Sequence, residues 1–302
     1  MSESCQWCCP INWRPLSQRQ MSRHLQRRVG IIIGRWGGWP GWTPLLLRMM
    51  GTNTQFDFLL ISDSSPPTSG IPLPPNVCFC YLPLPEMQAS VGLQLRLSVN
   101  LTLRRQGDVS AAKTNDLKPM WGEALSDLLQ GYEWWGYMQE DLLIGNLSTC
   151  IDEARLDDAD IICPNRPPNN SSGSFMLFRN VPYINRLWRL SQDAAQVLAD
   201  PRYLVFDEWW GSSTDNLAGV IGREAAAGRV RLSLARAGWP MFWNHDSEAF
   251  EDFAACWQYD GEQAMLHVVF GLPLHERGAT CLRPGKESNF RDEVCLFHFI
   301  KV

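Results

Sequence analysis

Residues 29–33 read Val-Gly-Ile-Ile-Ile, and this stretch decides the fold class. A short, uninterrupted apolar run rich in β-branched side chains is typical of a strand that is buried on both faces of a sheet. The run leads into Gly34-Arg-Trp-Gly-Gly-Trp-Pro-Gly41, whose glycines and proline cannot continue a strand. We therefore predict a buried first strand that ends in a loop over 34–41.

The same reading extends along the chain as alternating apolar runs and helical segments. Such alternation predicts an α/β fold with a mostly parallel sheet. In sheets of this kind ligands bind at the carboxyl ends of the strands. We expect the chemistry in the loops 34–41, 62–66, 139–141 and 207–208. The expected strands are 56–61, 76–81, 133–138, 160–163, 175–178 and 203–206, and the expected helices are 43–51, 116–129, 182–198 and 211–237.

Composition and charge narrow the class of protein. The 302 residues are 45% hydrophobic and 20% charged, which excludes a wholly disordered chain. The net charge of −5 argues against a nucleic-acid binder, and no apolar run is long enough for a transmembrane helix. Residues 1–29 are basic and are expected to form a mobile extension, which could contact a membrane surface peripherally or bind an acidic partner. One domain over 30–302 is expected to follow.

The ten cysteines are scattered and lie mostly in apolar contexts. This pattern favours buried free thiols over a disulfide framework. The N-terminal cluster contains a C-x-x-C, Cys5 to Cys8, but no second pair stands at zinc-finger spacing. With no secretory signal visible, a reducing cytoplasm is the expected compartment.

The most informative segment is Trp134-Trp-Gly-Tyr-Met-Gln-Glu-Asp141, in which an apolar strand runs directly into acidic residues. Carboxylates at a strand end are hard oxygen ligands that can hold Mg²⁺ or Mn²⁺ against a diphosphate. The alternative is a solvated strand end without a ligand.

Six motifs stand in a fixed order along the chain, at 31–40, 113–122, 134–145, 178–180, 206–208 and 298–301. Together they resemble a family of bacterial glycosyltransferase-like proteins with the GT-A fold, which is more distantly similar to the DXD transferases that use Mn²⁺ and nucleotide sugars. The resemblance covers 30–302. It implies a single GT-A-like α/β domain, with a Rossmann-like, mostly parallel central sheet flanked by helices.

The resemblance implies roles on the donor side. Ile33 and Gly34 would end the first strand at its nucleotide-facing turn. Lys113 and Asp116 would lie beside the donor nucleotide and its diphosphate, and Lys301 would contact a phosphate.

The resemblance also implies a metal site. Gln139 and Asp141 would occupy the two acidic positions of the DXD element, and His298 would be a late metal ligand. Gln139 departs from the family pattern because an amide brings no charge. Glu140 could compensate only where the backbone turns, because on a strand it would face away from Asp141.

On the acceptor side, the resemblance implies that Asp207 or Glu208 is the base or a hydrogen-bond partner of a sugar hydroxyl. Trp209 and Trp210 follow directly, and they either stack on an acceptor sugar or pack in the core. The resemblance thus predicts a metal-assisted hexosyltransferase that uses Mn²⁺ or Mg²⁺ and a nucleotide diphosphate sugar, with a UDP-sugar favoured, and a carbohydrate acceptor. The alternative, motivated by Gln139, is a nucleotide-sugar or glycan-binding protein with little or no turnover.

Overall fold

The computed structural model describes residues 28–41, 43–66, 68, 72–101, 112–165, 167–234, 242–244 and 296–298. Nearly all of the basic segment 1–29, the cluster at Cys5 and the terminal Lys301 lie outside these residues. The expectations for these three features therefore stay predictions.

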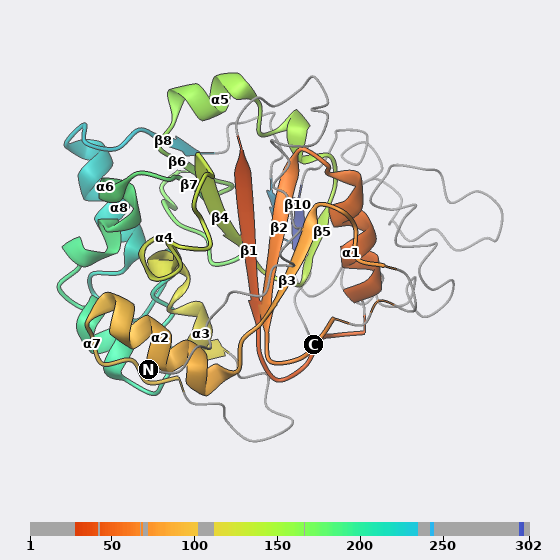
Figure 1. Ribbon diagram of the computed structural model, residues 1–302. Helices are drawn as coiled ribbons and strands as arrows, with labels where there is room; N and C mark the ends of the chain where they lie inside the picture. Colours follow the sequence, from red (N-terminus) through yellow and green to blue (C-terminus); the bar gives the residue numbers. More distant parts are fainter. Residues whose placement is uncertain are drawn as a thin grey trace, which may run out of the picture.

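A seven-stranded sheet forms the centre of the molecule (Figure 1). Its strands lie in the order β3-β2-β1-β4-β7-β6-β8. β1 pairs in parallel with β2 and β4, β2 with β3, and β6 with β8, whereas β7 runs antiparallel to both of its neighbours. The predicted α/β class with a mostly parallel sheet is confirmed. The strands are β1 Val29–Arg35, β2 Phe56–Ser62, β3 Val77–Tyr81, β4 Trp134–Met138, β6 Ile161–Cys163, β7 Phe175–Arg179 and β8 Leu232–Leu234.

Helices cover both faces of the sheet, because the strands carry apolar side chains on both faces, as β1 illustrates. Successive side chains of a strand point to opposite faces, so Ile32 packs in one apolar core while Ile31 and Ile33 pack in another. The core around Ile32 contains residues of α2 Leu84–Leu95, α4 Trp121–Ala124, α6 Pro182–Asn185, α7 Ala194–Ala199 and α8 Leu217–Ala226. The other core contains residues of α1 Thr43–Thr52 and α5 Glu153–Asp158.

A second, three-stranded sheet joins segments that are far apart in the sequence. β10 (Leu296–His298) lies between β5 (Leu142–Ile144) and β9 (Phe242–Asn244). It pairs antiparallel with β5 and parallel with β9. Among the described helices, none combines the length and the apolar character that a membrane crossing would require.

The predicted strand at 203–206 is wrong. The segment is irregular, and the N–H groups of Leu204 and Phe206 donate to the carboxylate of Asp116 at 2.9 and 2.8 Å instead of to a neighbouring strand. The predicted helix at 211–237 is too long: of its described residues, 211–234, only those of α8 are helical, and β8 follows.

The predicted helices at 116–129 and 182–198 are broken into short pieces. Within 116–129 the structure has a 3-10 turn at Lys118–Met120 and the single turn of α4, and α3 (Ala112–Asn115) ends just before this range. Pro119 lies at the start of this 3-10 turn, where its missing N–H and fixed φ disfavour a longer helix.

The second predicted helix consists of α6, a 3-10 turn at Leu187–Leu190 and α7. Between these last two, the Ser191 hydroxyl donates to the carbonyl of Asp215, and the Asp193 carboxylate accepts from Ser213 and Thr214. Polar side chains that bond elsewhere in this way compete with helix formation.

The cysteines differ in part from the expectation. Cys78 and Cys150 each take part in a disulfide bond, so the prediction of free thiols is wrong for these two. Cys163 is a buried free thiol, and its burial raises its pKa to about 12. It is therefore a protonated, unreactive core residue at neutral pH.

Candidate functional site

The candidate site lies at the edge of the central sheet where β1, β2 and β4 end and β7 begins. β1, β2 and β4 are parallel, so their carboxyl ends lie together, and β7 begins at the same edge because it runs in the opposite direction. Met138, the last residue of β4, is in register with Phe175, the first residue of β7. Three of the four loops predicted to carry the chemistry follow β1, β2 and β4 directly.

The loop after β1 presents bare backbone. Gly37 and Gly38 have φ values of 84° and 94°, a region that side chains strongly disfavour. A Cβ added at either position would meet no atom within 4 Å, so the backbone here borders open space. The Gly37 N–H donates to the Asp63 carboxylate, and the Trp39 indole donates to the carbonyl of Ser64 at 2.7 Å. The loops after β1 and β2 therefore hold each other in place.

An ion pair links the loop after β1 with the loop after β4. The Arg35 guanidinium lies 2.6 Å from Glu140 Oε1 and also donates to the carbonyl of Gly38 at 2.7 Å. Residues 140–141 form a turn, which directs the Glu140 carboxylate to Arg35. Glu140 therefore serves as the partner of Arg35, while Gln139 and Asp141 flank it.

Asp141 lies immediately before β5, and β5 pairs with β10. In this pairing Leu142 is in register with His298. The topology thus brings the backbone of the predicted DXD element next to that of the predicted late ligand. Within the described part of the chain, no three His, Cys, Asp or Glu residues form a group able to hold a metal ion.

A buried ion pair stands beside the ends of β4 and β7. Lys118 Nζ lies 3.1 Å from Asp207 Oδ2 and donates to the carbonyl of Gly173, and both side chains are almost fully buried. Its ammonium also lies 5.5 Å from the ring centre of Tyr137. Asp207 Oδ1 accepts the hydroxyl proton of Tyr203 at 3.0 Å. Both carboxylate oxygens of Asp207 are therefore engaged within the protein.

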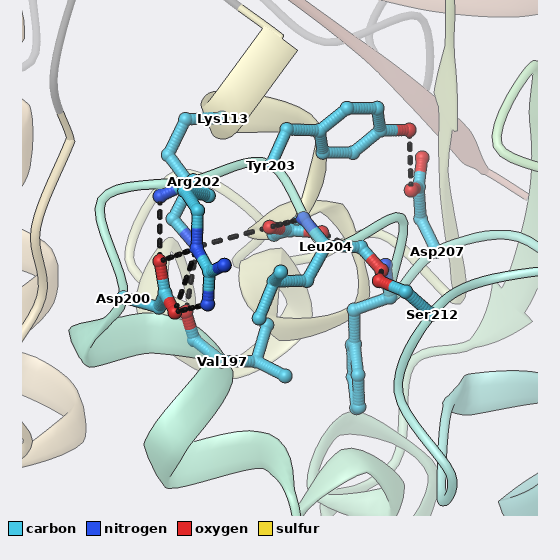
Figure 2. Close-up of polar contacts among 10 residues, drawn as sticks. Lys113, Val197, Asp200, Arg202, Tyr203, Leu204, Asp207 and Ser212 are labelled. Carbon is cyan, nitrogen blue, oxygen red and sulfur yellow. Dashed lines mark hydrogen bonds and ion pairs between the residues drawn. The ribbon is translucent and has the colours of Figure 1, made fainter.

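The predicted donor residues Lys113 and Asp116 form a second buried ion pair. Lys113 Nζ lies 2.9 Å from Asp116 Oδ2 and donates to the carbonyl of Val197. Burial raises the pKa of Asp116, while Lys113 and the N–H groups of Leu204 and Phe206 act in the opposite direction. Figure 2 shows Lys113 beside the segment that carries Leu204 and Asp207. In this arrangement the pair ties α3 to α7 and to the 203–207 segment.

Glu208 is the more accessible of the two predicted acceptor-side carboxylates. Its side chain is half-buried, whereas Asp207 is fully buried. A Cβ atom on Gly173 would lie 2.5 Å from Asp207 Oδ2 and 2.6 Å from Glu208 Oε1, so both carboxylates lie over the start of β7. Burial and these two negative charges raise the pKa of Tyr137 well above its ordinary value. Tyr137 is thus a neutral hydrogen-bond donor.

The remaining predicted donor residues lie in β1. Ile33 is fully buried in the core under α1, and a Cβ on Gly34 would lie 2.9 Å from the rings of Trp36 and Trp121. Gly34 therefore allows two indoles to close over the end of β1.

Sequence reasoning gave no role to four residues that the structure places at this edge: Arg35, Asp63, Lys118 and Tyr203. Two of the four stand in motifs quoted above, Arg35 in the motif at 31–40 and Lys118 in the motif at 113–122, and these positions are the signal that could have identified them.

Comparison with known proteins gives the family. A family model described as a family of unknown function, DUF6625, matches residues 31–220. The chain belongs to this family. No curated protein matches it. Among solved structures, it is similar to the galactosyltransferase LgtC in complex with donor and acceptor sugar analogues, at TM-score 0.44 and 9% identity over 90% of this chain and 87% of that chain. It is also similar to mouse xyloside xylosyltransferase 1, at TM-score 0.42 and 8% identity over 90% and 97%.

Proposed function

We propose that this protein is a GT-A-type glycosyltransferase. It would transfer a hexose from a nucleotide diphosphate sugar, with a UDP-sugar favoured, to a hydroxyl of a carbohydrate acceptor. The observation that carries the proposal is the pairing of β5 with β10, which supports a shared role for Asp141 and His298 at the sheet edge where Gly37 and Gly38 expose backbone.

The ligand types proposed for this edge are those that a divalent cation takes in proteins. Asp141 would supply a carboxylate, Gln139 an amide oxygen and His298 an imidazole, and this combination would suit Mn²⁺ or Mg²⁺. A bound cation would offset the charge that develops on the departing nucleotide diphosphate. Glu140 keeps its contact with Arg35 in this scheme and is not a ligand.

Other residues of the chain would contact the nucleotide, contact the acceptor or position these groups. The exposed backbone of the 36–41 loop can approach a nucleotide closely, because side chains are missing at Gly37 and Gly38. Glu208 is the carboxylate that can reach an acceptor hydroxyl, as a base or as a hydrogen-bond acceptor. Asp207 is a positioning residue, because Lys118 and Tyr203 occupy both of its oxygens.

The proposal is tested by thermal shift with UDP, GDP and CMP, each with and without Mn²⁺. A ligand that binds only the native state raises the apparent Tm by mass action. We expect a Mn²⁺-dependent increase with one nucleotide, and loss of its metal-dependent part in Asp141→Ala. The control is Asp158→Ala, which removes an exposed carboxylate of α5 and should leave the increase unchanged.

Two results would separate the alternatives. Full nucleotide affinity and full sugar transfer in Asp141→Ala would contradict the proposed site. A nucleotide-dependent increase that ignores Mn²⁺, without hydrolysis of the sugar donor, would indicate a binding protein, the function that Gln139 favours.

A further inference from the structure

We infer that Trp209 and Trp210 form a preorganised platform for an uncharged pyranose ring of the acceptor, with Glu208 as the hydrogen-bonding group beside it. This inference rests on the proposed transferase function and adds the chemical class of the acceptor. Four properties of the 203–216 loop support it: exposed aromatic rings, a rigid backbone, a negative charge and a position next to the end of β4.

The first property is exposure. Trp209 and Trp210 are 48% and 59% exposed, whereas Trp36, Trp121, Trp134, Trp135 and Trp188 are at most 2% exposed. Two indoles that stay exposed to water do not contribute the free energy that their burial would add to the stability of the fold. Core packing is therefore excluded as the role of this pair, and a ligand-binding role is favoured.

The second property is rigidity. Val205 has a φ of 59°, a conformation that a β-branched residue adopts only where its surroundings impose it. The flanking N–H groups of Leu204 and Phe206 are held by the buried Asp116. On the far side, a Cβ on Gly211 would collide with the Val205 carbonyl, so the loop closes tightly on itself.

Further bonds fix the residues of the platform itself. The Asn216 amide donates to the carbonyl of Glu208 at 2.9 Å, and the Leu217 N–H donates to the carbonyl of Phe206 at 3.1 Å. The platform is thus in place before a ligand arrives, which lowers the entropic cost of binding.

The third property is charge, and it selects the ligand. A pyranose has an apolar C–H face that can lie on an indole and a rim of hydroxyls that can donate to a carboxylate. Glu208 directly precedes Trp209 in the chain, and its carboxylate lies with that of the buried Asp207 over Gly173. The negative charge of Glu208 repels an anionic sugar, and a carboxylate oxygen can accept the hydroxyl protons that a neutral pyranose donates.

The fourth property is position. Gly173 contacts Lys118 and lies under Asp207 and Glu208. Ser174, the next residue, accepts a hydrogen bond at 2.9 Å from the backbone N–H of Gln139. The platform therefore stands one short segment away from the proposed donor site, as an acceptor subsite must.

The test uses the full chain and three neutral disaccharides, lactose, maltose and cellobiose, with sialyllactose as the anionic comparison. Binding is measured by calorimetry and by tryptophan fluorescence. We expect at least one neutral disaccharide to bind better than sialyllactose. Trp209→Ala or Trp210→Ala should raise its Kd roughly tenfold, as expected for loss of an anchoring aromatic contact. Trp209→Phe or Trp210→Phe should keep part of the affinity for the disaccharide that the corresponding alanine variant loses.

The matched control is Leu93→Ala, because Leu93 is 82% exposed but lies on α2. Its saccharide affinity should equal that of the wild type. The nucleotide shift with UDP and Mn²⁺ should stay unchanged in all of these variants.

Two outcomes would overturn the platform. One is unchanged saccharide affinity in both tryptophan variants, and the other is no binding of any neutral disaccharide to the wild type. Either result with an intact nucleotide shift refutes the platform alone. Saccharide binding at the tryptophans without any nucleotide shift would refute the transferase instead.

Discussion

The two sides of the candidate site are held in opposite ways. The 36–41 loop is fixed near the surface by backbone and indole hydrogen bonds and exposes glycine backbone. The 203–216 loop is fixed from below by two buried ion pairs, Lys113–Asp116 and Lys118–Asp207, and exposes aromatic rings. The difference indicates that one side is adapted to close approach by a ligand and the other to rigid display of side chains.

The largest expected effect comes from removing a buried charge under the second loop. Lys118→Met should lower the free energy of unfolding by about 3–5 kcal/mol, because it leaves the Asp207 carboxylate buried without its cation. Urea unfolding measures the change.

The control for this variant is Arg202→Met. Arg202 pairs with Asp200 at 2.7 Å, but its side chain is 68% exposed, so its removal should lower the free energy of unfolding far less than Lys118→Met does. Equal losses in the two variants would mean that burial does not distinguish the two pairs.

A smaller effect is expected on the glycine side. Gly38→Ala should destabilise the protein by about 1–2 kcal/mol, because its φ of 94° suits glycine and not alanine. The same variant should weaken binding of UDP, measured by calorimetry, while leaving saccharide affinity unchanged. Gly41→Ala is the control, since its φ is not in the left-handed region and its Cβ would also meet open space. A similar loss in Gly41→Ala would remove the conformational explanation.

The strain at Val205 gives a third test. Val205→Gly should leave the stability unchanged or raise it by up to about 1 kcal/mol, because relief of an unfavourable φ offsets the entropy that glycine loses on folding. Val181→Gly, at an ordinary φ of −127°, should instead destabilise the protein. Thermal unfolding of both variants measures these changes in stability. A clearly lower stability of Val205→Gly would show that packing of the valine outweighs its strain.

The smallest effect concerns Glu224, a residue of α8 whose side chain is covered by its partners. The Arg229 guanidinium and the Tyr183 hydroxyl hold the pKa of Glu224 at about 2, below its ordinary value of 4.5. Because the folded-state pKa is lowered, this stabilisation is fully present above about pH 4.5 and is lost as the pH falls toward 2. In Glu224→Gln, the free energy of unfolding should therefore fall less steeply over this range. Parallel slopes for the two proteins would contradict the assignment.

Local patterns were enough to predict most of the sheet. The apolar runs at β1, β2, β4 and β7 are read correctly from sequence, because a strand buried on both faces leaves a continuous apolar signature. The junction at 134–141 was likewise visible, since the acidic residues follow the strand directly.

Long-range contacts explain what could not be predicted. Tyr203 to Phe206 has the composition of a strand, but the Asp116 carboxylate takes the N–H groups that a strand would use. The local sequence gives no sign that Lys118 is buried, because its burial depends on Asp207 in a distant segment. The exposure of Trp209 and Trp210 is set by the same loop, so the sequence left their role open.

The order of strands in the sheet has a kinetic consequence. β1 is flanked by β2, which follows it closely in the chain, and by β4, which is distant in the chain. Ile32 of β1, for example, is in register with Leu59 of β2 on one side and with Tyr137 of β4 on the other. During folding, one edge of β1 stays open until the distant β4 docks. An open edge that carries Ile31, Ile32 and Ile33 is a template for intermolecular pairing. Refolding yield should therefore depend strongly on protein concentration, because aggregation competes with closure of this edge.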